Sequence, residues 1–167
     1  MLMNWEDYLM EETNVLKNKF GVKNQEELSK LEIALVLPKM SYVHDYGYEG
    51  DFDSEHLCGL HHFLFSDLYD FAGKYREVAL FGEYSGFLEP ELIPGELEKV
   101  MQFFKNYDFQ GSKFEMAMFL AEYYYRLIMI HPFREGNGRT IREFIRQFIS
   151  YKFPEYSIDL QKIDKKK

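Results

Sequence analysis

A single stretch of the chain concentrates the residue types that carry out phosphate chemistry. It reads His131-Pro-Phe-Arg-Glu-Gly-Asn-Gly-Arg-Thr-Ile-Arg142. Glycines flank Asn137 where a helix is expected to begin, and a residue without a Cβ lets the backbone turn tightly and approach a ligand. The first N–H groups of a helix have no partners within it and, with the helix dipole, form an anion site. This stretch therefore predicts a site for phosphate.

The charged side chains of the stretch fit the same interpretation. Arg139 and Arg142 lie one turn apart on the expected helix, and a planar guanidinium can bind two phosphate oxygens. Glu135 beside a phosphate site favours a divalent cation, because Mg²⁺ is typically held by one or two carboxylates together with substrate phosphates. His131 is the obvious base, since an unperturbed imidazole titrates near neutrality. Together these residues indicate phosphoryl or nucleotidyl transfer.

The composition excludes several classes of protein. The chain has 167 residues, of which 46 % are hydrophobic and 18 % aromatic, enough for one ordinary domain with a core of large rings. A formal net charge of −8 argues against non-specific nucleic-acid binding, so a phosphate site must be a local positive region. Cys58 is the single cysteine and permits no internal disulfide, and no apolar run reaches the length of a bilayer span. Because the N-terminus also lacks a signal-peptide pattern, we expect a cytoplasmic protein without membrane or direct nucleic-acid partners.

Helices are expected on both sides of the phosphate-site stretch. A capping-box pattern at Ser112 and Glu115 predicts a long apolar helix that continues to about Ile130 and is ended by Pro132. Apolar residues at helical spacing on one face of 137–152 predict the helix that follows. The stretch that carries the chemistry is thus expected to be the loop between two core helices.

The elements before this helix pair are also mostly helical. Asn24 predicts a helix that stops before Pro38, followed by a connector over 41–53. Ser54 is expected to cap a helix that stops at Gly73, and helical spacing over 95–107 predicts another. Short extended pieces within 76–87, around a glycine-bearing turn, predict a small β-hairpin, with an irregular loop as the alternative. The expected fold is an all-α bundle with this one hairpin.

The 131–142 stretch resembles the motif of the Fic family, His-x-Phe-x-Asp/Glu-Gly-Asn-Gly-Arg-x-x-Arg, at every specified position. The likeness extends upstream to most of the chain, through His56–Phe65, Tyr69-Asp-Phe-Ala-Gly-Lys-Tyr-Arg76, Phe87–Pro94 and Thr13–Gly21. The last of these is similar to a segment of stand-alone bacterial members. The resemblance implies an N-terminal helical extension over 1–48 and a Fic-type catalytic domain over 49–167, an all-α bundle with a small β-hairpin flap.

The activity that the resemblance implies is AMP transfer from ATP to a Ser, Thr or Tyr hydroxyl of a target protein. His131 would be the general base, and Phe133 would pack inward to hold the loop. By the same resemblance, Glu135 would hold Mg²⁺. The N–H groups of Gly136, Asn137 and Gly138, together with the Asn137 side chain, would bind the phosphates. Arg139 would contact the β-phosphate region and Arg142 the γ-phosphate. The flap would offer its edge to the target, with Phe87 as a clamp beside Gly86.

Regulation and partners are also expectations from the resemblance. Many members carry an inhibitory helix with a Ser/Thr-x-x-x-Glu-Gly/Asn pattern, which this sequence lacks; Ser29 and Glu32 are one residue too close together. The inhibitor is therefore expected on a separate antitoxin or on a longer C-terminus, since the chain ends sooner after Arg142 than most members do. A toxin of a toxin–antitoxin pair that modifies a type II topoisomerase follows by analogy.

Alternative functions stay open at this point. The chain could transfer another phosphate-containing group, as a kinase or another nucleotidyl transferase does, or bind a nucleotide without turnover. The intact His131 argues against a pure binder, because binding alone needs no base. Among residues outside these roles, we expect His61 to be structural and half-buried, Arg134 to be solvated, and Arg146 to lie at the surface or in a salt bridge.

Overall fold

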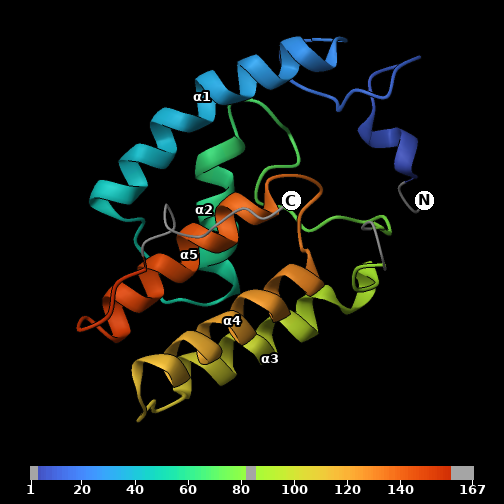
Figure 1. The fold of residues 1–167 in the computed structure, drawn as a ribbon. Helices are drawn as coiled ribbons and strands as arrows, with labels where there is room; N and C mark the ends of the chain where they lie inside the picture. The colour runs from blue at the N-terminus through green and yellow to red at the C-terminus, as the bar shows by residue number, and fades with distance from the viewer. Residues whose placement is uncertain (1–3, 82–85, 159–167) are drawn as a thin grey trace.

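The chain folds into a bundle of helices (Figure 1). A computed structural model describes residues 4–81 and 86–158. The α-helices within these ranges are α1 (Gln25–Tyr46), α2 (Ser54–Phe65), α3 (Ile93–Asn106), α4 (Lys113–Ile130) and α5 (Asn137–Lys152), and the short 3₁₀-helices are η1 (Trp5–Tyr8) and η2 (Pro90–Leu92). None of the described helices is long and apolar enough to cross a membrane.

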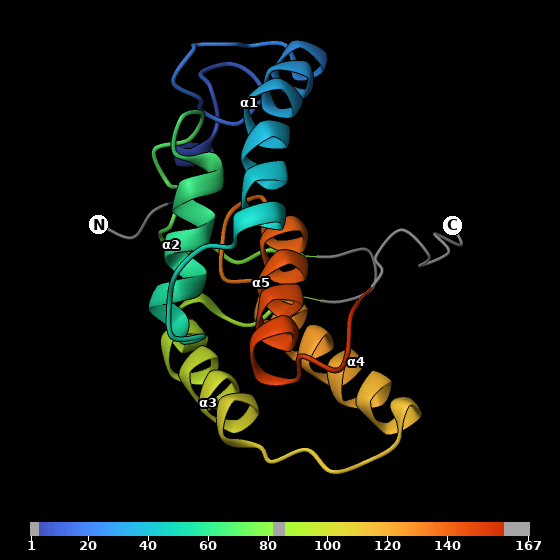
Figure 2. The same cartoon turned by 90° about the vertical axis from the view of Figure 1, so that its left-hand side faces the viewer.

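Helix α5 lies at the centre of the bundle. It packs on α2 and on α4, and α4 lies side by side with α3, as Figures 1 and 2 both show. The face predicted to be apolar is buried in the core, through Ile141, Phe144, Ile145, Phe148 and Ile149. The aromatic core expected from composition is present here, since the Tyr123 ring stacks face to face on Phe104 and meets Phe148 edge-on. The loop before α5 is therefore held by a rigid helix on each side.

The predicted ends of the two core helices are confirmed. Ser112 caps α4, where its hydroxyl accepts the Glu115 N–H and the Glu115 carboxylate accepts the Ser112 N–H. The helix ends at Ile130, two residues before Pro132, and α5 covers the predicted 137–152. These ends depend on contacts within four residues, which is why the sequence alone locates them.

The prediction that the first helix stops before Pro38 is wrong, because α1 continues through this proline to Tyr46. A proline within a helix removes one backbone hydrogen bond. The last turns of α1 make contacts that offset this loss: Val43 is fully buried, and its carbonyl accepts a hydrogen bond from Arg146 of α5. The connector is consequently 47–53 instead of the expected 41–53.

Helix α2 also differs from its prediction at both ends. Asp53 is the cap in place of Ser54, because its carboxylate accepts the His56 N–H. The helix ends at Phe65, well before Gly73, and the chain turns so that the Tyr69 N–H bonds back to the Phe65 carbonyl. The turn after the helix also buries its apolar residues, including Leu68. The leucine spacing therefore continues past Phe65 although the helix does not.

The predicted β-hairpin is not shown by the structure. The described residues of this segment form one isolated antiparallel bridge between Phe81 and Gly86, next to a hydrogen bond from the Phe87 N–H to the Leu80 carbonyl. The turn that would join two strands, 82–85, lies outside the described residues. The division of the chain into 1–48 and 49–167 stays a prediction.

Candidate active site

The loop between α4 and α5 turns through two left-handed residues. His131 closes α4 at φ 48°, and Gly136 opens α5 at φ 82°. A Cβ on Gly136 would lie 2.6 Å from the Phe65 ring and 3.2 Å from Nε2 of His61. The glycine is therefore required both by its backbone angle and by the close approach of α2. This packing fixes the start of α5 against α2.

His131, the candidate base, has one of its two ring nitrogens in a hydrogen bond. Its Nδ1 lies 3.2 Å from the carbonyl oxygen of Ile128, and because a carbonyl only accepts, Nδ1 carries the proton. The lone pair of Nε2 is left for a substrate proton. The Phe87 ring stacks on the imidazole with a centroid distance of 3.8 Å and an interplanar angle of 18°. Burial lowers the pKa of His131 against the opposing effect of the bond to Ile128, and the charge of Arg76 adds a smaller lowering, so the ring is neutral near pH 7.

Arg76 is a buried cation that holds His131 through backbone carbonyls. Its Nε donates to the His131 carbonyl at 2.7 Å and its Nη2 to the Ile130 carbonyl at 3.2 Å. The same guanidinium donates to the carbonyls of Val78, at 2.8 Å, and of Leu88. A positive charge at the C-terminal end of α4 also suits the helix dipole. Arg76 thus joins the C-terminal end of α4, where His131 lies, to the segment that leads to Phe87.

The N-terminus of α5 presents unused backbone donors. The first hydrogen bond of this helix runs from the Thr140 N–H to the Gly136 carbonyl, at 3.1 Å. Within the described residues, the N–H groups of Asn137, Gly138 and Arg139 have no backbone acceptor. Of the N–H groups that the sequence assigned to phosphate, those of Asn137 and Gly138 are therefore unused at the start of this helix, and the Arg139 N–H lies beside them. The Gly136 N–H, assigned to phosphate as well, donates to the Glu135 carboxylate in this conformation.

The Asn137 side chain closes the loop on itself. Its Oδ1 accepts the Phe133 N–H at 2.8 Å and its Nδ2 donates to the Phe133 carbonyl at 2.7 Å. Because both ends of this buried amide are engaged, the expected side-chain contact with phosphate is not available in this conformation, and the backbone N–H is what Asn137 offers. Phe133 is fully buried, as predicted, and stacks on His61 at 3.8 Å.

His61 supports the loop from α2. Its Nδ1 accepts the Gly73 N–H at 2.8 Å, so Nε2 carries the proton and donates to the Glu135 carbonyl, also at 2.8 Å. Burial lowers the pKa of His61 to about 4, against the opposing effect of the bond to Glu135. His61 is structural, as expected, but it is fully buried instead of half-buried.

Glu135 is the one acidic residue of the motif loop. Its Oε1 accepts the Gly136 N–H at 2.8 Å and lies 3.6 Å from Nη2 of Arg139. Within the described residues, no group of three or more His, Cys, Asp or Glu side chains could hold a metal ion. A single half-exposed carboxylate beside an anion site fits Mg²⁺ arriving with a nucleotide, because the phosphates and water supply the other ligands.

The two motif arginines have different surroundings. Arg139 pairs with Glu32 of α1, with 2.6 Å between Nη1 and Oε1, and lies over the Phe65 ring at 4.8 Å. Arg142 is exposed, and no described residue forms an ion pair or hydrogen bond with it. Arg142 is therefore available to a ligand without breaking a contact, whereas Arg139 is already oriented.

Arg134 and Arg146, to which the sequence assigned no nucleotide contact, are both more buried than a surface arginine. Arg146 forms the predicted salt bridge, at 2.6 Å from Glu143, and is more buried than a surface residue. The prediction that Arg134 is solvated is wrong: its guanidinium is buried over the Trp5 ring, with 4.0 Å to the centroid, and near Tyr8. The cause is the N-terminal segment, which covers the motif loop at this point.

Comparison with known families matches residues 51–149 to the Fic/DOC family. The chain belongs to this family. Among curated proteins, this Fic chain is 32% identical over 160 residues to protein adenylyltransferase VbhT of Bartonella schoenbuchensis. It is 30% identical over 158 residues to the Sinorhizobium fredii protein named "Probable protein adenylyltransferase y4lH". These matches cover 95% and 93% of the chain, 33% of VbhT and 80% of y4lH.

Solved structures have the same fold. The Fic chain superposes with a TM-score of 0.81 on BepC of Bartonella tribocorum with bound AMPPNP, at 25% identity, covering 96% of this chain and 83% of that one. The TM-score is also 0.81 for the N-terminal Fic domain of a Bep effector protein of Bartonella quintana with bound ADP, at 28% identity and coverage of 96% and 82%.

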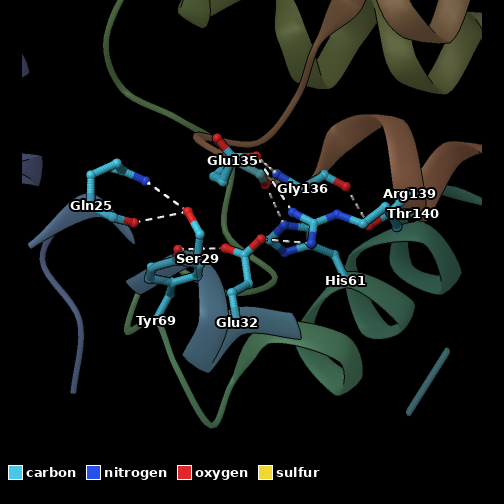
Figure 3. Close-up of polar contacts among 9 residues, drawn as sticks. All are labelled: Gln25, Ser29, Glu32, His61, Tyr69, Glu135, Gly136, Arg139 and Thr140. Carbon is cyan, nitrogen blue, oxygen red and sulfur yellow. Dashed lines mark hydrogen bonds and ion pairs between the residues drawn. The ribbon is translucent and has the colours of Figure 1, made fainter. Parts of the chain in front are cut away.

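Sequence reasoning missed two residues of the Fic site, Glu32 and Tyr69. Both lie far from the motif in the sequence, and each resembles an ordinary surface or core residue in its own helix or turn. Figure 3 shows them beside Arg139, with Glu32 between the guanidinium and the Tyr69 hydroxyl. No local pattern in the sequence indicates this contact.

Proposed function

We propose that this Fic chain transfers AMP from ATP to a Ser, Thr or Tyr hydroxyl of a target protein, with His131 as general base. The observation that carries the proposal is the neutral His131, with Nε2 unprotonated, on the same short loop as the free N–H groups of α5. The names of the curated relatives support AMP transfer, and the neighbours with AMPPNP and ADP support a nucleotide substrate.

In the proposed reaction, Nε2 of His131 takes the proton of the target hydroxyl. The hydroxyl oxygen bonds to the α-phosphorus of ATP while the bond from this phosphorus to the bridging oxygen breaks, and pyrophosphate leaves in line. The α5 N–H groups, with Arg139 and Arg142, bind and orient the phosphates. Mg²⁺ held by Glu135 would offset the negative charge of the α- and β-phosphates when it is bound.

The target is proposed to approach over the segment that carries Gly86 and Phe87. The bridge between Phe81 and Gly86 offers backbone groups to an extended peptide, which would add a strand beside it. Phe87 lies against His131, so a peptide held there would bring its hydroxyl close to the base. This proposal also includes several expectations from the family. They are the flap itself, a type II topoisomerase as the target, a separate antitoxin with an inhibitory glutamate, the toxin role and a cytoplasmic location.

The position of the label in ATP separates this function from its alternatives. The purified chain is incubated with a bacterial lysate, Mg²⁺ and ATP labelled at the α- or the γ-phosphate. Protein labelled from the α-position alone supports AMP transfer, and label from the γ-position would instead indicate a kinase. If the chain binds nucleotide but no protein in several different bacterial lysates is labelled from either position, the chain would be a nucleotide-binding module.

A further inference from the structure

Glu32 of α1 reaches the candidate active site from outside the motif. Its Oε1 lies 2.6 Å from Nη1 of Arg139, and both side chains are partly buried, with 16% and 30% of their surface exposed. An ion pair shielded in this way is stronger than one at the open surface. Figure 3 shows Glu32 on one side of Arg139 and Glu135 near its other side.

Tyr69 fixes the second oxygen of Glu32. The Tyr69 hydroxyl donates to Oε2 of Glu32 at 2.6 Å, and its ring stacks on Phe71 at 4.7 Å. Burial, and then the neighbouring Glu32, raises the pKa of Tyr69, so the hydroxyl stays protonated and remains a donor. Each carboxylate oxygen of Glu32 therefore has its own partner, and the carboxylate is held in one orientation.

Arg139 lies between two carboxylates that compete for it. Nη1 is at 2.6 Å from Glu32, and Nη2 is at 3.6 Å from Oε1 of Glu135. Glu135 precedes Arg139 by four residues, a spacing that favours their pairing. If Glu32 lost its charge, Glu135 would be the carboxylate left beside the guanidinium. A tight Glu135–Arg139 pair would neutralise the group that is proposed to hold the cation.

We propose that Glu32 is a positioning residue that draws Arg139 away from Glu135. Glu135 is thereby kept free for the divalent cation, and the remaining N–H donors of Arg139 are aimed at the phosphates. The Phe65 ring under the guanidinium holds its plane while Glu32 holds one edge. This inference rests on the proposed function, since it assumes that a magnesium–nucleotide complex binds at the start of α5.

The test is the dependence of nucleotide binding on Mg²⁺ in the variant Glu32→Gln. Binding of a fluorescent ATP analogue to the purified chain is measured while Mg²⁺ is titrated. Because Gln keeps the shape and removes the charge, we expect the half-saturating Mg²⁺ concentration to rise about tenfold. Tyr69→Phe, which releases Oε2 of Glu32, should shift it in the same direction by less.

The matched control is Glu26→Gln, on the same helix. Glu26 pairs with Lys30 at 2.6 Å at the exposed surface, so its loss should leave the Mg²⁺ titration unchanged. A contact that only stabilises α1 would lower the unfolding temperature of Glu32→Gln without moving the Mg²⁺ midpoint of the folded protein. If Glu32→Gln does not fold, the midpoint of Tyr69→Phe decides in its place.

Other outcomes would overturn the inference. An unchanged Mg²⁺ midpoint in both variants would show that Glu32 does not act on Glu135. Tighter nucleotide binding by Glu32→Gln would show that Glu32 competes with phosphate for Arg139 instead of positioning it. Failure of the wild-type chain to bind the analogue at any Mg²⁺ concentration would instead reject the proposed function.

Discussion

The Arg76 guanidinium and the His131 main chain are joined by a hydrogen bond of 2.7 Å from Nε to the carbonyl oxygen. His131 needs such a contact, because its left-handed backbone at φ 48° is unfavourable for a residue with a Cβ. The same guanidinium bonds to the carbonyl of Leu88, next to the Phe87 ring that stacks on His131. One buried cation therefore positions both His131, the proposed base, and the residue that covers it.

Arg76→Lys should lower both stability and transfer. A lysine keeps the charge but cannot reach the four carbonyls that the planar guanidinium serves, and hydrogen bonds from charged donors are the strong ones. We expect the free energy of unfolding to fall by about 3 kcal/mol, measured by denaturant unfolding. Arg126→Lys, at an exposed pair with Glu122, is the control and should change it little. Equal stability of the two variants would argue against this role of Arg76.

Phe87→Ala should raise the pKa of His131. Burial is the largest cause of the lowered pKa, and the stacked ring is part of that burial, so its removal returns the pKa of the imidazole toward its ordinary value of 6.5. Because the base works only when neutral, transfer by the variant should then be lost at a higher pH than in the wild type as the pH falls. NMR titration of the His131 ring measures the shift. Phe81→Ala, at the exposed phenylalanine of the bridge, should leave the pKa of His131 unchanged.

His61 should make the protein less stable in mild acid. Its pKa is lowered from 6.5 to about 4 by burial, so between these values the unfolded chain binds a proton that the native chain does not. The free energy of unfolding therefore falls as the pH falls through this window, by about 3 kcal/mol at about 1.4 kcal/mol per pKa unit.

The variant His61→Gln isolates this effect. Its amide can still donate to the Glu135 carbonyl but does not titrate, so the pH dependence of its unfolding should be smaller than that of the wild type by about one proton. His56 and His131 titrate in both proteins, so they contribute to both curves. Parallel curves for wild type and variant between pH 6.5 and 4 would contradict a buried neutral His61.

Features that depend on neighbours in the sequence were predictable. The capping box at Ser112 and the proline after Ile130 place α4, and the motif glycines place the turn into α5. The helical spacing of apolar residues indicates α2, α3 and α5, and the capping-box patterns at Asn24 and Ser112 indicate α1 and α4. The family was recognisable for the same reason, since its motif occupies twelve consecutive residues, 131–142.

Features that depend on distant contacts were not predictable. The helix α1 passes Pro38 because Val43 and Arg146 pack against each other from separate helices. Arg134 is buried because Trp5 covers it from the other end of the chain. No spacing rule connects such pairs, and a single sequence gives no signal of which distant residues meet.

The most direct test of the central claim compares AMP transfer and ATP binding in the wild type and in His131→Ala. Alanine removes the imidazole and leaves the N–H groups of α5 and both motif arginines in place. We expect transfer of α-labelled AMP to the target to fall by at least about a hundredfold, with the ATP dissociation constant nearly unchanged. Transfer by His131→Ala at the wild-type rate would contradict the assignment of His131 as the base.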